Sequence, residues 1–308
     1  MKNQDVYDMV NKRILELMES GEFSWHKPWK GDGQPCNLET KRAYRGINTW
    51  TLGYTEFNSP YWLTYKQARK FGGHVRKGEK SNTVVFWKPL RNVKVTNDDG
   101  DDERKNVLLL KYYRVFNAEQ CDGIDHKIPV VEVNDNDPLA ECDKVWEGYE
   151  DKPELVFNNP GRAFYKPSVD TINMPKLEQF DGSEEYYSTL FHESIHSTGH
   201  KERLNRLKPD FFGGQDYSRE ELVAEMGAAF LCGVTGINNK TEYNSAAYLQ
   251  GWAKELRNDR RLFVNAAAQA QKASDWILGK EQNNGEAYTD ETADAGSNKK
   301  KEGEPVAC

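Results

Sequence analysis

The pattern His192-Glu193-x-x-His196 constrains this chain more than any other feature of its 308 residues. One turn of an α-helix takes about 3.6 residues, so side chains four positions apart project from the same face. On a helix, His192 and His196 can therefore reach one metal ion, with Glu193 beside them. The flanking sequence predicts that helix, because Ser183 and two acidic residues open it and Gly199 follows its last turn.

A catalytic zinc site keeps three protein ligands and one open position, so a third ligand is expected downstream. Our prediction is Glu225, which lies in an apolar stretch where an unpaired carboxylate would be costly to bury. An ion pair with an arginine is the alternative for Glu225. Glu221 is assigned to a capping box with Ser218 at the start of the same helix.

The expected metal is zinc, with manganese or another divalent ion as the alternative. Glu193 is the expected general base, which takes a proton from water and passes it to the leaving amine.

A longer zincin pattern, with a histidine as third ligand, would need that histidine at the position of Glu202, so this ligand set is excluded. His200 and Tyr217 are candidates for a role behind the ligands or for stabilising an oxyanion, and the sequence does not choose between them.

The first third of the chain combines aromatic and basic residues. Residues 24–90 hold twelve Lys and Arg against four acidic residues, a net charge of +8 in a chain whose total is −7. Unpaired bases stack on aromatic faces while Lys and Arg follow the phosphates, so this mixture favours single-stranded DNA. For any single tryptophan, a place in a hydrophobic core is the simpler alternative. The predicted DNA contacts are Trp25, Lys27, Trp29, Lys41, Arg42, Tyr44, Arg45, Tyr65, Lys66, Arg69, Lys70, Arg76, Lys77 and Lys80.

The order of the predicted elements indicates an α+β protein of two domains. A helix over 4–20 and two strands, 83–87 and 107–116, belong to a small α+β domain, 1–128. The metal helix and two later helices belong to a second domain, 129–280, and a charged tail, 281–308, is expected to be disordered. No apolar run approaches a membrane span, and five widely spaced cysteines indicate no disulfide framework. The expected location is cytoplasmic, without a membrane partner.

A series of short motifs runs through both halves of the chain. They include Trp25-x-Lys27-Pro28-Trp29, Tyr44-Arg45-Gly46-Ile47-Asn48, Leu63-Thr64-Tyr65-Lys66-Gln67-Ala68, Phe191 to His196, and Glu220-Glu221-Leu222-Val223-Ala224-Glu225. In this order they resemble the ArdC-type antirestriction proteins of conjugative plasmids and other mobile elements. The resemblance covers about residues 4–278. It implies an N-terminal single-stranded DNA-binding domain followed by a zincin-like metallopeptidase domain.

The same resemblance implies protection of incoming DNA from host restriction, which would make a host restriction enzyme a further partner. A replication or primase accessory protein, with a structural or regulatory zincin domain, is the alternative. Protection by proteolysis and protection by coating the DNA or occluding the restriction enzyme are both open. Coating or occlusion is favoured slightly, because the sequence offers no recognisable pocket for a specific peptide substrate.

Overall fold

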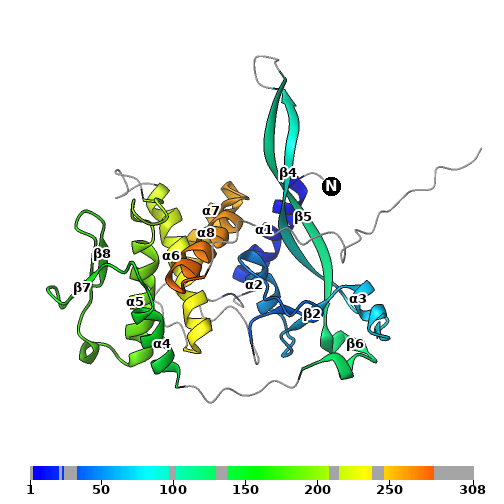
Figure 1. Cartoon of the computed structure of the whole chain (residues 1–308), viewed down its shortest axis with the longest axis horizontal. Coiled ribbons are helices and arrows are strands. Elements are labelled where there is room, and N and C mark those ends of the chain that lie inside the picture. Colours follow the sequence, from blue (N-terminus) through cyan, green and yellow to red (C-terminus); the bar gives the residue numbers. More distant parts are fainter. Residues whose placement is uncertain are drawn as a thin grey trace, which may run out of the picture.

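The computed structural model describes residues 3–20, 23, 33–96, 102–129, 137–207, 215–237 and 246–280. Helices and strands are mixed, which confirms the α+β class (Figure 1). The helices are α1 (Asn3–Glu19), α2 (Ile47–Gly53), α3 (Tyr65–Lys70), α4 (Pro138–Glu147), α5 (Ser183–Ser197), α6 (Gln215–Thr235), α7 (Ala246–Asn258) and α8 (Leu262–Ile277). The strands are β1 (Cys36–Asn37), β2 (Tyr61–Leu63), β3 (His74–Val75), β4 (Asn82–Thr96), β5 (Asp102–Asn117), β6 (Cys121–Asp122), β7 (Glu154–Val156), β8 (Phe164–Lys166) and β9 (Thr171–Asn173). Three 3-10 turns are η1 (Ala118–Gln120), η2 (Asp125–Lys127) and η3 (Leu177–Gln179).

A long antiparallel hairpin, β4–β5, dominates the N-terminal lobe and projects from it (Figure 1). Its strands are longer than the two predicted from the sequence, and the loop between them lies outside the described residues. The hairpin belongs to a four-stranded sheet of order β1-β2-β5-β4, in which only β1 and β2 are parallel. Thr64 caps α3 through a capping box with Gln67, which fixes the start of that helix.

The C-terminal lobe consists of α4 to α8 and a small sheet of order β7-β9-β8. Helix α5 has the predicted acidic first turn, but Ser183 is its first residue and not its cap, since Gly182 takes the N-cap position without a side-chain hydrogen bond. Helix α6 begins at Gln215, about one turn before Ser218, so the pair Ser218 and Glu221 does not open that helix. This corrects the capping role predicted for Glu221. The tail, 281–308, lies outside the described residues.

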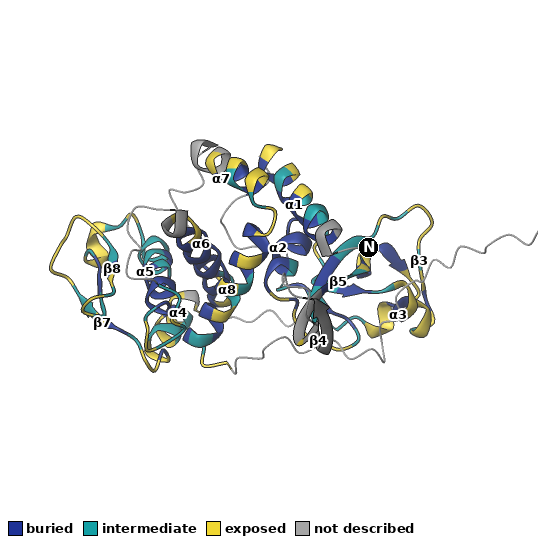
Figure 2. Cartoon of the chain, turned by 90° about the horizontal axis from the view of Figure 1, so that it is seen from above, coloured by how far each residue is buried: buried dark blue, intermediate teal, exposed yellow. Residues whose placement is uncertain are grey.

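The two lobes share one hydrophobic core. Ile14 of α1 and Trp50 of α2 belong to the same buried cluster as Phe230 of α6 and Phe263 of α8. The buried faces of these helices meet at the centre of the molecule (Figure 2). The domain boundary near residue 128 therefore stays a prediction, because packing is continuous across the two predicted domains. No helix among the described residues is long and apolar enough to cross a membrane.

Candidate metal centre and nucleic-acid interface

Helices α5 and α6 approach closely because one of them carries a glycine at the contact. A Cβ atom added to Gly227 of α6 would lie 2.6 Å from Cδ1 of Ile195 on α5. A larger side chain at 227 would therefore push the two helices apart. Gly199 also permits a close contact, since a Cβ added there would lie 2.7 Å from Cγ of Leu207. The φ of Gly199 is not positive, so the close contact with Leu207, and not a left-handed backbone, accounts for glycine at this position.

The two histidines of α5 face a carboxylate of α6. The Nε2 atoms of His192 and His196 lie 3.1 Å apart. The carboxylate of Glu221 lies 3.5 Å from Nε2 of His192 and 3.4 Å from Nε2 of His196. Atoms bound about 2.0–2.2 Å from one ion at roughly tetrahedral angles have such separations. These three side chains form a group that could hold a divalent metal, and His192 is only partly buried, which leaves the group accessible.

The structure does not bring Glu225 to the metal-facing side of the histidines. Its Oε1 atom lies 2.9 Å from Nδ1 of His192, on the ring nitrogen opposite the one that faces Glu221. The prediction of Glu225 as third ligand therefore disagrees with this geometry, and so does its alternative, an arginine partner. Glu225 lies where a carboxylate fixes the tautomer and the orientation of a ligating histidine.

Glu220 occupies the equivalent place behind His196. Its Oε1 lies 3.5 Å from Nδ1 of His196, and Arg206 binds the same carboxylate through Nε at 2.8 Å and Nη2 at 2.6 Å. Burial alone would lower the pKa of His196, but the carboxylates of Glu220 and Glu221 outweigh it and raise that pKa to about 9. Sequence reasoning did not identify Glu220 or Arg206. The sequence signal that could have found Glu220 is the presence of three glutamates, Glu220, Glu221 and Glu225, on the one helix that was expected to face the two histidines.

Glu193 is held by the small sheet beside α5. Its Oε2 atom accepts a hydrogen bond of 2.7 Å from the backbone N–H of Tyr165 in β8. The hydroxyl of Tyr165 donates to Asp170, which has φ of 48° and binds Arg203 through both carboxylate oxygens. Nε of Arg203 donates to the hydroxyl of Tyr149. A polar network, buried except at Asp170, therefore supports the strand that orients the predicted general base.

Of the two remaining candidates, His200 lies beside this network, and Tyr217 has a side chain outside the described part of the structure. His200 lines a polar hollow of about 650 Å³ together with Asp170 and Arg203. Its Nδ1 atom accepts a long hydrogen bond of 3.4 Å from the backbone N–H of Glu202. Tyr217 lies in the first turn of α6, but its side chain is not among those that the structure describes.

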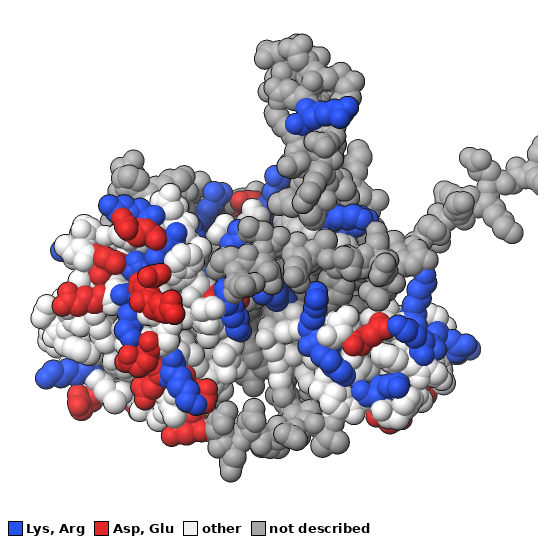
Figure 3. All heavy atoms as spheres, in the orientation of Figure 1, with Lys and Arg blue, Asp and Glu red and all other residues white. Residues whose placement is uncertain are grey.

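The predicted DNA-binding cations lie mainly on the N-terminal lobe. Lys and Arg gather there around α3, whereas the other lobe mixes both signs of charge (Figure 3). Several are paired: Lys70 with Glu39, Arg76 with Glu79 and Asp122, and Arg45 with Asp275 of α8, while Lys41 lies 5.0 Å from the ring centroid of Tyr61. Arg42, Lys66, Arg69, Lys77 and Lys80 are exposed.

The predicted aromatic contacts divide into three groups. Tyr65 is 55% exposed on α3, as a stacking platform requires. Tyr44, predicted as a DNA contact, is only 5% exposed, because its ring packs against Trp62 and other core residues. Trp25 and Trp29, with Lys27 between them, lie outside the described residues. Trp50 and Trp62 are fully buried, so these two tryptophans are residues of the hydrophobic core and not DNA contacts.

Comparison with known proteins assigns both lobes. The model for the N-terminal domain of anti-restriction factor ArdC matches residues 4–116, and the zincin-like metallopeptidase model, MPTase-PolyVal, matches residues 152–269. The metal-free crystal structure of antirestriction protein ArdC from plasmid R388 is similar, with a TM-score of 0.71 and 38% identity. That comparison covers 89% of this chain and 97% of the R388 protein. The chain belongs to the ArdC antirestriction family.

Other relatives place the same unit in different contexts. The Mn(II)-bound ArdC structure from R388 has a TM-score of 0.72 and 37% identity, over 90% of this chain and 98% of that one. Protein y4eC of Sinorhizobium fredii, which is uncharacterized, is 32% identical over 89% of this chain and 91% of its own. DNA primase TraC of Escherichia coli is 33% identical over 90% of this chain. The ArdC-like chain spans only 27% of that primase.

Proposed function

We propose that this ArdC-family chain binds single-stranded DNA through its N-terminal lobe and protects incoming DNA from host restriction. We further propose a peptidase-type metal centre in which His192, His196 and Glu221 hold zinc or manganese. The observation that carries the metal centre is the convergence of two Nε2 atoms and one carboxylate within 4.8 Å of one another. The DNA-binding role is supported by the family and by the exposed cations around α3.

A divalent ion at this centre would supply Lewis acidity toward water and toward a peptide carbonyl oxygen. The surrounding side chains orient the histidines and move protons. Glu225, 2.9 Å from Nδ1 of His192, orients that ring, whereas Glu220 lies 3.5 Å from Nδ1 of His196, which has no hydrogen-bond partner among the described residues. Because Oε2 of Glu193 is held by the N–H of Tyr165, its Oε1 is the atom that takes a proton and delivers it to a leaving amine.

Conjugation into a restricting recipient tests the proposal. Wild type is compared with Glu193→Gln, which removes the base, and with a Lys77→Ala, Lys80→Ala double variant, which removes two exposed cations. Loss of protection in the cation variant alone indicates protection by DNA binding, the outcome we favour. Loss in Glu193→Gln as well indicates proteolysis, provided that its fold and DNA affinity are intact. Undiminished restriction with the wild-type chain present would reject the antirestriction role.

A second candidate, accessory to DNA priming, is supported by the TraC primases, which contain a region 33% identical to this chain. In that role the chain would hold a single-stranded template for a primase. Primer synthesis on single-stranded DNA, measured with a primase and with or without this chain, separates the two functions. An increase in primer yield without protection during conjugation would favour the accessory role.

A further inference from the structure

A polar hollow lies in the N-terminal lobe between α1, the segment that follows α2 and the connection from β3 to β4. We call it the Arg13 hollow, because Arg13 of α1 lines it together with Lys80 of the connection and Asn82 of β4. Its volume is about 580 Å³, within the range of about 300–1,000 Å³ that ligand sites occupy. None of the residues that line it belongs to the metal centre.

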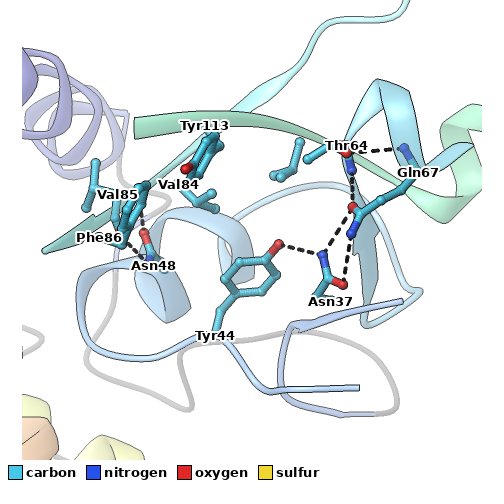
Figure 4. A pocket seen from close by; sticks show the side chains of 10 residues that line it. Asn37, Tyr44, Asn48, Thr64, Gln67, Val84, Val85, Phe86 and Tyr113 are labelled. Atoms are coloured by element: carbon cyan, nitrogen blue, oxygen red, sulfur yellow. Dashed lines mark hydrogen bonds between the residues drawn. The ribbon is translucent and has the colours of Figure 1, made fainter. Parts of the chain in front are cut away.

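A smaller pocket of the same lobe lies between α2, the start of α3 and the β4–β5 hairpin (Figure 4). Its volume is about 40 Å³, which is space for about three water molecules. Its polar side chains bind one another, since Asn37 donates to Gln67, whose Oε1 atom accepts from the N–H of Thr64. Only the Arg13 hollow therefore has both the room and the unused donors that a ligand requires, of these two.

Arg13 is a half-buried cation without a carboxylate partner among the described residues. Its Nη2 atom donates to the backbone carbonyl of Tyr54 at 3.2 Å, and its other N–H groups meet no acceptor in the described part of the chain. By contrast, Arg203 and Arg206 each bind a carboxylate through two nitrogen atoms. A guanidinium that is withdrawn from solvent without a countercharge indicates that an anion binds beside it.

The other side chains of the Arg13 hollow add donors and little negative charge. The ammonium of Lys80 and the amide of Asn82 have no partner within the described ranges. Two acids also line the hollow, but Glu79 already pairs with Arg76 at 3.0 Å, and Glu56 is exposed. With the guanidinium, the hollow has two cations and one amide against one exposed carboxylate. This balance favours an anionic group such as a phosphate.

A tight turn connects the Arg13 hollow to the surface cations. The N–H of Glu79 donates to the carbonyl of Arg76 at 3.4 Å, and Gly78 between them has φ of 93°, as the third residue of a type II turn requires. A Cβ atom added to Gly78 would meet nothing within 4 Å, so this face of the turn is open. Lys77, the second residue of the turn, is exposed. A strand with one phosphate in the hollow can therefore place a neighbouring phosphate near Lys77.

We propose that the Arg13 hollow binds a backbone phosphate of single-stranded DNA, with Arg13, Lys80 and Asn82 as the contacting groups. The inference rests on the proposed single-stranded DNA binding and assigns it a site away from the surface around α3. Arg13 and Asn82 are absent from the contacts predicted from the sequence. Because the contacts go to a phosphate, this site should bind strands of any base sequence.

Fluorescence anisotropy with oligo-dT of about twelve nucleotides tests the site on the full chain. Arg13→Gln should lower affinity about tenfold and flatten the logarithmic salt slope by about 0.7, the contribution of one phosphate contact. Asn82→Ala changes no charge, so it should lower affinity about threefold and leave the slope unchanged. Lys12→Gln removes one charge from the neighbouring exposed position of α1 and is the matched control, which should bind as wild type does.

Three outcomes of this titration would contradict a part of the argument. Wild-type affinity in both Arg13→Gln and Asn82→Ala would overturn the phosphate site and leave the DNA-binding function intact. An equal loss in Lys12→Gln and Arg13→Gln would show an effect of net charge alone and would also overturn the site. Absence of salt-dependent binding by wild type would instead reject the DNA-binding function itself.

Hydrogen exchange of the wild-type chain supplies a measurement that needs no substitution. Oligo-dT should slow the exchange of backbone amides in residues 77–82, whereas dTMP at the same phosphate concentration should protect them much less. Protection confined to α3 would place the strand elsewhere and overturn the proposal. Equal protection by dTMP would identify a site for a free nucleotide and would overturn the assignment to a DNA strand.

Discussion

Glu221 and Glu225 lie four residues apart on α6, so helix periodicity places both on the face that meets α5. Both are buried, and the sequence offers no measure of which one reaches the ring nitrogens that a metal would use. The structure separates them by depth: Glu221 faces the Nε2 atoms, and Glu225 lies behind His192 at Nδ1. The proposed ligand Glu221 and the orienting residue Glu225 thus have similar burial, the same charge and the same face of the helix, so the sequence alone does not distinguish them.

Substitution of these glutamates should affect metal binding unequally. Glu221→Ala removes a ligand and should abolish stoichiometric binding of Zn(II) or Mn(II). Glu225→Gln should weaken binding by about 10–100-fold, because it disturbs only the orientation of His192. Isothermal titration of the metal-free protein measures both effects, with Glu184→Gln in the first turn of α5 as control. Full binding by Glu221→Ala would restore Glu225 as the third ligand.

Protons should compete with the metal for His196. Burial opposes its charge, but Glu220 and Glu221 raise its pKa from 6.5 to about 9, whereas a metal needs the neutral ring. Metal affinity should therefore increase as pH rises toward about 9. The metal-free fold should show the opposite trend: a raised native pKa gives stability that is complete below pH 6.5 and is lost as pH rises through about 9. Thermal unfolding with and without metal checks both signs, and a metal-free protein that gains stability over this range would contradict them.

At the scale of helices and strands, the sequence predicts an element best where the spacing of its apolar residues and the residues at its ends indicate the same structure. The motif, acidic first turn and terminal glycine predict the metal helix, and α5 begins at Ser183, one residue earlier than a cap at Ser183 implies. The predicted hairpin is shorter than β4–β5, because Pro89 and the charged residues that follow it interrupt the apolar run of Thr83 to Trp87. Trp50 and Trp62 could not be distinguished from surface aromatics by composition, since burial depends on contacts distant in the chain.

The strand β8 depends on an ion pair that the sequence did not reveal. Arg203 has a side chain 2% exposed, and Asp170 is its carboxylate partner. Asp170→Ala should destabilise the fold by about 2–4 kcal/mol, because it leaves a buried guanidinium without a countercharge. Glu19→Ala, which breaks the exposed pair with Arg257, should cost no more than about 1 kcal/mol. Urea unfolding compares the two, and similar losses would show that the Asp170 network has no special role.

At the scale of the whole molecule, the lobes are joined by polar contacts as well as by the shared core. Arg45, at the entrance to α2, pairs with Asp275 of α8, and the N–H of Gly46 donates to Oε1 of Gln271 at 3.0 Å. Ser274 of α8 in turn donates to the backbone carbonyl of Gly227, the residue that allows α5 and α6 to approach. Motifs from the two predicted domains therefore meet at α8, a relation that no local sequence pattern could indicate.

This arrangement gives Arg45 a different role from the exposed cations with which the sequence grouped it. The carboxylate of Asp275 is buried, with a side chain 2% exposed, so it needs a countercharge. Arg45→Ala should lower the free energy of unfolding by about 1–3 kcal/mol and leave the salt dependence of DNA binding nearly unchanged.

Lys77→Ala should leave stability nearly unchanged and reduce the salt dependence of DNA binding. Lys77 is exposed, so its loss should change stability by no more than about 0.5 kcal/mol. If Lys77 contacts a phosphate, its removal should flatten the logarithmic salt slope by about 0.7, the contribution of one phosphate contact to single-stranded DNA. Urea unfolding and anisotropy titrations at several salt concentrations measure both quantities on each variant. A flattened slope with unchanged stability in Arg45→Ala would show that Arg45 binds phosphate after all, and that the contact with Asp275 yields to DNA.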